Sequence, residues 1–400
     1  MKNIKNVTKE IIWIGASDRR LHLFENMFPI PRGVSYNSYV LLDEKTVLLD
    51  TVDSSVAGQF FENLDAALNG RPLDYLVINH MEPDHCATID EVVRRFPQVT
   101  LVGNAKTFPM ISQFFDFTLP EEQKLVVKEG DTLSTGSHTL NFVMGPMVHW
   151  PEVMVTYDSK DKVLFAADAF GTFGALNGNL FADEVNFERD WLPDARRYYT
   201  NIVGKYGANV QALLKKAAGL DIAMICPLHG PVWRENIAWF LDKYQKWSTY
   251  EAEDKAVAIF YSSVYGDTAS AVDALGGKLG EKGIKDIRIY DVSNTDISDM
   301  IAEMFRVSTI VIAATTYNAG VFPKMENLLA DMKALQVQKK AVALIENGSW
   351  APMSGKKMRE EVEAMKEMQI LEPSVTIKSA MKASQEAELD ALAEAIARSL

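Results

Sequence analysis

The sequence has very few cysteines and no long apolar run. Two cysteines in 400 residues, Cys86 and Cys226, cannot build a disulfide framework. Each is expected to be a small buried apolar residue rather than a thiolate ligand. No stretch approaches about 18 uninterrupted apolar residues, so no membrane span is predicted. The N-terminus also lacks the apolar core and cleavage site of a secretory signal. We therefore expect a cytoplasmic protein.

Basic residues are also in the minority. The chain has 41 Lys and Arg against 54 Asp and Glu, which gives a formal net charge of −13. No stripe of Lys or Arg stands out, and this argues against a nucleic-acid partner. The same acidity repels an acidic protein at long range, so docking of such a partner needs a local basic patch. The apolar content of 48% is typical of a globular protein.

The length of the chain exceeds one ordinary core, so two domains are expected. Residues 1–250 show short strand-like runs divided by Gly, Asp and Asn, with amphipathic helices between them. This pattern is typical of a sandwich of sheets. The expected strands are 10–14, 38–42, 46–50, 75–78, 153–157 and 163–167, and the expected helices are 55–68, 208–219 and 237–247. A polar stretch at 251–255 marks the predicted boundary.

Residues 255–400 change to a strict alternation of strands and helices. The expected strands are 256–261, 287–292, 309–314, 341–345 and 375–377, and a closing helix covers 385–400. Five strands that alternate with helices predict a doubly wound parallel sheet. Such a sheet binds its ligand outside the carboxyl ends of its strands.

Potential metal ligands cluster directly after the apolar run 75–78. Further candidates follow other strand-like runs, and the set is His80, Glu82, Asp84, His85, His149, Asp168 and His229. A single His after a strand is more often a packed or surface residue than a ligand. Seven such residues at strand ends favour a site for two metals, because alternate residues of the first cluster can diverge toward different ions. Imidazole with carboxylate is a donor set that suits iron.

The pattern H-x-E-x-D-H with a distant His, Asp and His resembles the metallo-β-lactamase superfamily. That resemblance implies an αββα fold, in which two facing sheets are flanked by helices. Most hydrolases of the superfamily have His at the third motif position and bind zinc, whereas this chain has Glu82. The Glu variant within 79–85, together with 147–151 and 168–171, is similar to the flavodiiron proteins, also called A-type flavoproteins.

Three loops at predicted strand ends form a second group of candidate residues. They are Ser262, Ser263, Val264, Tyr265, Gly266 and Thr268, then Thr315, Thr316, Tyr317, Asn318, Ala319 and Gly320, and finally Asn347, Gly348, Ser349 and Trp350. Hydroxyls, a glycine and a helix start can wrap a phosphate. No G-x-x-x-x-G-K is present, which excludes a nucleoside-triphosphate loop. Tyr317 and Trp350 suit a flat ring, although ordinary packing at the rim explains each one equally well.

Taken together, the three loops resemble flavodoxin, which implies bound FMN. One position departs from that pattern, because the carboxylate of Asp267 would repel a phosphate unless it faces away. The whole chain resembles the minimal two-domain flavodiiron type, with domains 1–250 and 255–400. The resemblance implies two irons: His80, Glu82 and His149 on one, Asp84, His85 and His229 on the other, and Asp168 between them. Some members of the family leave the position of His85 uncoordinated.

The implied activity is detoxifying reduction of dioxygen to water or of nitric oxide to nitrous oxide, and the sequence leaves the preference open. The resemblance also implies rubredoxin or another redox carrier as electron donor, and a head-to-tail homodimer or a dimer of such dimers. His22, Tyr198, Tyr199 and Trp150 are candidates to shape the pocket or donate hydrogen bonds, with core packing equally open. His138 is expected in a polar turn without a role.

Two other functions compete with this interpretation. A zinc-dependent hydrolase of the metallo-β-lactamase fold is the alternative from the first domain alone, but Glu82 and the flavodoxin-like half argue against it. A pure electron carrier would use only the second domain, and the complete set of seven ligands argues against that.

Overall fold

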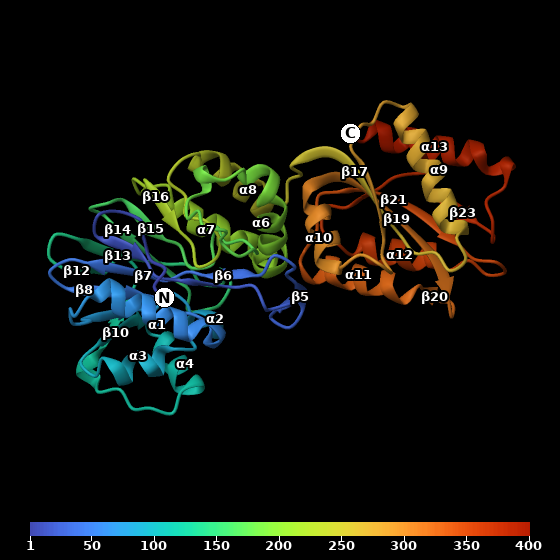
Figure 1. Cartoon of the computed structure of the whole chain (residues 1–400). Helices are drawn as coiled ribbons and strands as arrows, with labels where there is room; N and C mark the ends of the chain where they lie inside the picture. The colour runs from blue at the N-terminus through green and yellow to red at the C-terminus, as the bar shows by residue number, and fades with distance from the viewer. The chain divides into compact units, whose positions relative to one another are not determined.

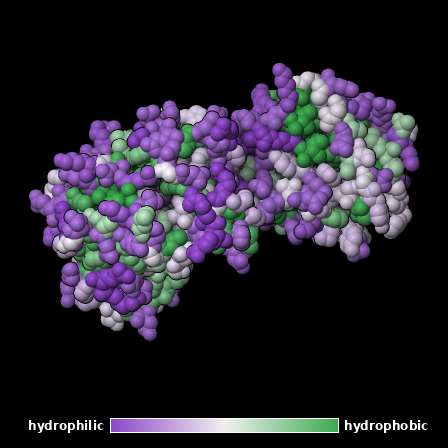
Figure 2. Space-filling model, in the orientation of Figure 1, coloured by the Kyte–Doolittle hydropathy of each residue, from purple (hydrophilic) through white to green (hydrophobic).

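The computed structural model describes residues 1–400 and divides into two compact units, Met1–Tyr244 and Gln245–Leu400 (Figure 1). The change of unit falls inside helix α8 (Ile237–Thr249), a few residues before the polar stretch at 251–255. None of the helices combines the length and the apolar character needed to cross a membrane. The visible surface of both units is mostly hydrophilic, as a chain of net charge −13 requires (Figure 2).

The first unit is built on two sheets. One has the strand order β1-β2-β7-β8-β9-β10-β11 and the other the order β12-β13-β14-β15-β16. The first sheet contains Lys5–Asn6, Ile11–Trp13, Tyr39–Leu42, Thr46–Leu49, Tyr75–Val77, Thr100–Asn104 and Lys124–Val127, and the second contains Thr132–Ser134, Thr139–Met144, Met154–Asp158, Val163–Phe165 and Met224–Cys226. Figure 1 shows α1, α3 and α4 along one side of the sheets and α6, α7 and α8 along the other, which confirms the predicted αββα sandwich.

The three helices expected from amphipathic patterns are present, and each of their ends lies within two residues of the expected position. The helices of this unit are α1 (Ala57–Leu68), α2 (Pro83–Cys86), α3 (Ile89–Arg95), α4 (Thr107–Phe114), α5 (Phe187–Asp190), α6 (Leu192–Tyr198), α7 (Gly207–Ala217) and α8. Strands β8, β9 and β10 run parallel, so their carboxyl ends meet at one edge. In the other sheet β15 and β16 are also parallel. Both edges supply side chains to the site described below.

Several elements have no clear sequence signal. The strands β10 to β13 were not expected, and β11 and β12 are only partly buried, so they lack a continuous apolar pattern. The hairpin of β4 (Leu23–Phe24) and β5 (Phe28–Pro29) is too short to show any period. His138 lies in the predicted polar turn, between β12 (Thr132–Ser134) and β13 (Thr139–Met144), but its side chain is fully buried. Its two ring nitrogens lie 2.9 Å from carboxylates of Asp158 and Glu10.

The second unit is the predicted doubly wound sheet. Its parallel strands have the order β18-β17-β19-β21, and β22 and β23 both pair with β21. The strands are β17 (Asp254–Tyr261), β18 (Ile287–Asp291), β19 (Val307–Tyr317), β20 (Gly320–Val321), β21 (Ala341–Asn347), β22 (Gln369–Ile370) and β23 (Val375–Ile377). The fifth strand position is thus divided in two, and Pro373, which has no N–H for a ladder bond, lies between the pieces.

Five helices cover this sheet. They are α9 (Asp267–Glu281), α10 (Ile297–Arg306), α11 (Pro323–Ala334), α12 (Ser354–Glu363) and α13 (Glu386–Arg398). The apolar faces of α9 and α13 pack together on one side, where Leu275 and Leu389 join Val257, Val311 and Ile345 of the central strands in one buried cluster. Burial of both sheet faces explains why the central strands are continuous apolar runs.

Candidate metal centre and cofactor pocket

The first cluster of ligands changes direction at Pro83. His80 and Glu82 lie in an extended segment after β9, and the backbone of Glu82 is extended (φ −68°, ψ 140°). Pro83 then occupies the first turn of α2, where its missing N–H costs nothing. Asp84 and His85 therefore belong to a helix, and they reach the pocket beside the first pair, with the rings of His80 and His85 6.1 Å apart. This local change of backbone sends neighbouring residues to two different positions.

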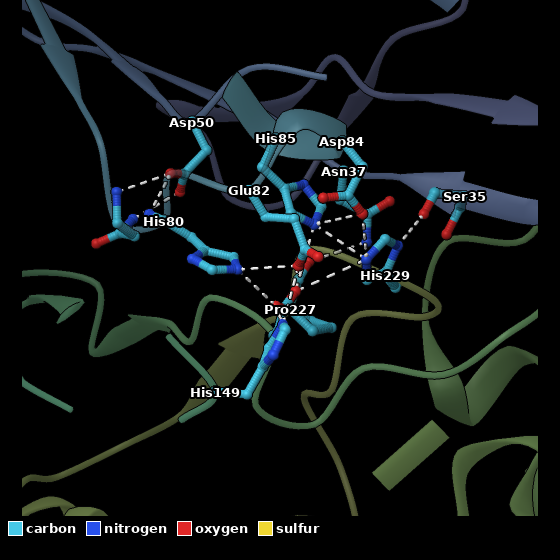
Figure 3. Close-up of polar contacts among 12 residues, drawn as sticks. Ser35, Asn37, Asp50, His80, Glu82, Asp84, His85, His149, Pro227 and His229 are labelled. Atoms are coloured by element: carbon cyan, nitrogen blue, oxygen red, sulfur yellow. Dashed lines mark hydrogen bonds and ion pairs between the residues drawn. The ribbon is translucent and has the colours of Figure 1, made fainter. Parts of the chain in front are cut away.

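The seven predicted ligands come together in two adjacent groups (Figure 3). His80, Glu82, His149 and Asp168 form one group, and Asp84, His85 and His229 form the other. Within each group the ligand atoms all lie within 4.8 Å of one another. Each group has the size of a single metal-binding position, and the seven side chains come from segments far apart in the sequence.

Asp168 lies between the two groups. Its Oδ2 is 3.1 Å from His80 Nε2 and 3.2 Å from His149 Nε2. Its Oδ1 is 3.3 Å from the Nε2 atom of His85 and 3.7 Å from that of His229. The two oxygens of one carboxylate thus face different groups, as a carboxylate that bridges two ions must. The Nε2 atoms of His85 and His229 are 2.9 Å apart and converge on a single point.

The donor set fits a pair of cations. Both carboxylate oxygens of Asp84 and of Asp168 are buried without a hydrogen-bond partner. A buried, unpaired carboxylate is costly, and a bound divalent cation removes that cost. Burial opposes ionisation of Asp168, yet the nearby His80 holds its pKa well below the usual range. Burial likewise opposes the charged form of His149, but Asp168 and Glu82 raise its pKa to about 9. The pocket therefore favours positive charge.

Buried partners hold two of the imidazoles by their second nitrogen. His80 Nδ1 is 2.9 Å from Glu152 Oε1, and the same oxygen accepts a hydrogen bond from the Met81 backbone N–H at 2.8 Å. His229 Nδ1 donates to the Ser35 carbonyl oxygen at 2.7 Å. Such partners fix the ring and its tautomer for metal binding. His85 differs, because its Nδ1 is buried without a partner.

The backbone segments that carry the ligands are also fixed. Asp50, at the end of β8, accepts hydrogen bonds from the backbone and side-chain nitrogens of Asn79, both at 2.7 Å. Asn37 donates from its amide to the carbonyl oxygens of Pro227 and Gly230 at 2.9 and 2.8 Å. These bonds position the residues next to His80 and around His229 (Figure 3). Neither Asp50 nor Asn37 was predicted, because both act across long sequence separations.

Four predicted pocket residues have different surroundings. The ring of Trp150 is 5.4 Å from that of His80 and perpendicular to it. The buried ring of Tyr198 is 5.4 Å from that of His229. The ring of Tyr199 instead lies 5.0 Å from that of Tyr244. His22 is exposed, and only its backbone carbonyl is engaged, by the N–H of Ile30 at 2.9 Å.

Glu25 lies near the pocket, although no sequence pattern marks it as a candidate. It lies at the turn of the β4–β5 hairpin with φ 50°. Its carboxyl lies near that of Glu82, where lost solvation together with the Glu82 charge raises the pKa of Glu25 to about 8, although the residue as a whole is exposed. Glu25 therefore holds a proton at neutral pH at the edge of the metal pocket. Cys86 and Cys226 are both buried and belong to neither ligand group.

A separate cavity of about 360 Å³ lies at the carboxyl ends of the strands in the second unit. It is lined by Ser263, Val264, Tyr265, Asp267, Thr268, Thr315, Thr316, Tyr317, Asn347, Gly348, Ser349, Trp350, Ala351 and Ser379. Five predicted residues do not line it, namely Ser262, Gly266, Asn318, Ala319 and Gly320. Ala351 and Ser379 line it without having been predicted.

The residues beside this lining shape the loops. Gly266 has φ 99°, a left-handed conformation that glycine adopts without strain, and its N–H donates to Ser263 Oγ at 3.0 Å. Helix α9 begins at the next residue, so its free N–H groups face the cavity end where Ser263 and Thr268 offer hydroxyls. Asp267 also lines the cavity and brings a carboxylate to this end.

The rim of the cavity is aromatic and open. The exposed fraction is 94% for Tyr265 and 92% for Trp350, and Tyr317 is half-exposed. Large aromatic side chains so free of packing cannot be explained by the core of the unit. A phosphate cradle of hydroxyls and helix N–H groups with exposed aromatic rings beside it fits a phosphorylated cofactor with a flat ring.

Known proteins resemble this chain over nearly its whole length. A family model described as ODP family beta lactamase matches residues 34–230. The anaerobic nitric oxide reductase flavorubredoxin of Klebsiella pneumoniae is 33% identical over 350 residues, which cover 86% of this chain and 72% of that protein. The rubredoxin oxygen:oxidoreductase of Desulfovibrio gigas superposes with a TM-score of 0.92 at 26% identity, covering 99% of this chain and 98% of that one. The flavodiiron protein from Giardia intestinalis has the same fold, with a TM-score of 0.93 at 23% identity over 100% and 97% of the two chains.

Proposed function

The chain belongs to the flavodiiron proteins, a family of oxidoreductases that carry FMN and a diiron centre, and from this premise we propose that it reduces dioxygen, nitric oxide or both. The observation that carries the proposal is the position of Asp168 between two groups of imidazole and carboxylate donors. The names of the relatives support both gases, since one is a nitric oxide reductase and another an oxygen oxidoreductase. The preference between the two gases is the part that experiment must decide.

The proposed ligand assignment follows the two groups. His80, Glu82 and His149 would hold one iron, and Asp84, His85 and His229 the other, with Asp168 shared. His85 is the weakest member of the set, because no partner orients its second ring nitrogen. When bound, the irons supply one electron each to a small substrate and FMN replenishes them.

The chain's own residues close the pocket and hold protons near it. Both reactions consume protons, and the raised pKa of Glu25, about 8, keeps one near Glu82 at the edge of the pocket. Trp150 packs against His80, and Tyr198 packs against His229, so bulky rings limit water on both sides. In the second unit, Ser263, Thr268 and the start of α9 would bind the FMN phosphate, and Tyr265, Tyr317 and Trp350 would flank the ring.

Turnover can be tested on the protein loaded with iron and FMN, reduced without oxygen and then mixed with either gas. We expect rapid reoxidation of the flavin by at least one of them. Asp168→Asn should lose iron and turnover yet keep FMN, because the two cofactor sites lie in different units. Asp194→Asn, which removes only a surface ion pair with Arg32, is the matched control. A colourless zinc protein with no gas consumption would contradict the proposal and favour a hydrolase.

We also propose a head-to-tail homodimer, in which the FMN of one subunit serves the metal centre of the other. The open aromatic rim of the FMN cavity supports this, since exposed aromatic residues are typical of interfaces. Mixed dimers provide the test: a subunit with Asp168→Asn is combined with one that cannot bind FMN. Turnover should reappear on mixing, because one working pair of sites forms. Continued full turnover by dilute monomers would exclude this arrangement.

Rubredoxin or another redox carrier is the proposed electron donor. Steady-state assays with each carrier would identify it.

A further inference from the structure

A row of contacting aromatic rings connects the metal pocket to the surface of the first unit. We define the aromatic row as Phe170, Tyr244, Phe240, Trp233 and Trp239. The ring centroids of Phe170 and Tyr244 are 4.4 Å apart, and those of Tyr244 and Phe240 are 5.4 Å apart. Phe240 stacks on Trp233 at 4.3 Å with an interplanar angle of 12°. Trp239 completes the row at 6.3 Å from Trp233.

The inner end of the row is bonded to a proposed metal ligand. The backbone N–H of Phe170 donates to the Tyr244 hydroxyl oxygen at 2.5 Å. Phe170 is two residues after Asp168, which lies between the two groups of ligands. A short path of covalent bonds and one hydrogen bond therefore joins the phenol of Tyr244 to the residue proposed to bridge the irons. Tyr199 adds a second oxidisable ring 5.0 Å from Tyr244.

The outer end of the row is set for positive charge. Trp239 is half-buried and lines a cavity of about 690 Å³ together with Trp233 and Phe187. Four acidic residues line the same cavity, namely Asp183, Glu184, Glu188 and Glu235. Arg234 pairs with only two of them, Asp183 and Glu184. Lys243 Nζ also lies 5.6 Å from the centroid of the Trp239 ring. The four carboxylates outnumber the two nearby cations, Arg234 and Lys243, so the surroundings of Trp239 remain negative and would stabilise a positive charge on its indole.

Packing alone explains the row incompletely. Trp233 has an exposed fraction of only 2%, and its Nε1–H is buried without an acceptor. A buried N–H without a hydrogen-bond acceptor destabilises the fold, so a phenylalanine at this position would fill the space without that cost. What an indole offers beyond a phenyl ring is ease of one-electron oxidation. The same property belongs to Trp239, which is next to Trp233 in the row, and to Tyr244, which is separated from Trp233 by Phe240.

We propose that the aromatic row carries single electrons inward to the metal site, so that an incomplete reduction of substrate does not damage the ligands. This function rests on the proposed reductase activity. One electron leaves the indole of Trp239 and passes through Trp233 and Tyr244 to the oxidised site. The phenol of Tyr244 releases its proton when it is oxidised and takes a proton back when the electron from Trp233 arrives, so the row gains and loses no atoms overall. Trp239 is left as a radical cation. A thiol reductant in solution restores it, and two thiols that each give one electron and one proton form a disulfide.

The unmet N–H of Trp233 suits this transfer. An oxidised indole becomes a strong acid at Nε1 and is trapped as a neutral radical if an acceptor takes that proton. Trp233 has no such acceptor, so the charge remains mobile and moves on to Trp239. There the carboxylates hold it within reach of solvent reductants.

The test uses full-length protein loaded with iron and FMN, without an electron donor, exposed to hydrogen peroxide. Freeze-quenched samples are examined by electron paramagnetic resonance, and oxidised residues are mapped by peptide mass spectrometry. We expect a tryptophanyl or tyrosyl radical and oxidation of Trp239 in the iron protein. Zinc-loaded protein should show neither. In Trp233→Phe, oxidation at Trp239 should fall to the level of the zinc protein, and damage should move to Tyr244 or the ligand histidines.

Trp191→Phe is the matched control, because Trp191 is also buried but lies outside the row, beneath the Arg32 guanidinium. It should leave oxidation at Trp239 unchanged. Equal oxidation of Trp239 in the iron and zinc proteins, or in Trp233→Phe, would overturn the proposal, since solvent attack alone would explain it. If Trp233→Phe does not fold, the electron paramagnetic resonance spectrum of Trp239→Phe after peroxide treatment tests the same proposal. Consumption of dioxygen and nitric oxide is measured separately. If neither gas is consumed but the radical still forms as expected, the proposed reductase function is refuted and the proposed role of the aromatic row is not.

Discussion

Replacing Glu152 by Gln tests whether the metal centre depends on its outer partners. Glu152 is 1% exposed, and its Oε1 accepts hydrogen bonds from His80 and from the Met81 N–H. Glutamine keeps one oxygen acceptor but removes the negative charge that makes His80 a strong ligand. Loss of such a partner weakens metal binding by about 10- to 100-fold, or about 1.4–2.7 kcal/mol. We expect this loss for the iron bound by His80 and a smaller effect on the other iron.

The assay is competition for iron between the protein and a chelator of known affinity, followed by the visible spectrum. Glu152→Gln places an amide nitrogen where Oε2 is now buried without a partner, so folding of the metal-free protein is measured in parallel. Glu129→Gln is the matched control, since Glu129 bonds to Lys216 and to the Met144 N–H near the surface and contacts none of the proposed ligands. Unchanged iron affinity in Glu152→Gln would refute the idea that this carboxylate supports the ligand.

Three further predictions concern the second unit. Lys340 is buried, with Nζ 2.8 Å from the Val307 carbonyl oxygen, and burial lowers its pKa to about 7. In the unfolded chain the lysine keeps its proton up to pH ~10.5. The free energy of unfolding should therefore rise between pH 7 and 10 by about 1.4 kcal/mol per pH unit and be constant below pH 7. Urea unfolding of Lys340→Met should show no such dependence on pH. Asp267→Asn should tighten the binding of FMN but not of riboflavin in fluorescence titrations, because only FMN carries the phosphate that Asp267 repels. Equal changes in affinity for both ligands would disprove this repulsion. Gly266→Ala should lower the free energy of unfolding by about 1–2 kcal/mol and weaken the binding of FMN, because a φ of 99° is strained for alanine. An unaltered melting temperature would count against this prediction.

Local sequence patterns were sufficient for the fold of the second unit and for much of the first. Strands β17, β19 and β21 are buried on both faces, so each is a continuous apolar run visible without a structure. Strands β11 and β12 are only partly buried and left no such run. The two-residue strands of the Glu25 hairpin are too short for any period. These elements exist because of their neighbours rather than their own composition.

The ligand candidates could be selected from the sequence because metal chemistry restricts the residue types. His80, Glu82, Asp84 and His85 are also close in the chain, and Pro83 marks where the backbone turns. The loop residues around Ser263 and Asn347 were accessible for a similar reason, since ligands of parallel sheets lie at strand ends. Yet Gly266 shapes its loop instead of lining the cavity, and Ser379 reaches the cavity from a segment with no motif.

The sequence by itself determined which residue types stand at the ends of which strands, and hence the class of metal and cofactor the chain can hold. Only the tertiary structure decided which oxygen of Asp168 faces which group, that Glu152 supports His80 from 72 positions away, and that His85 has no such support. It alone brought Trp239 and Phe170 to the two ends of one row. The physical reason is that hydrogen bonds and ring contacts act over a few ångströms in space, and a linear sequence does not record those distances.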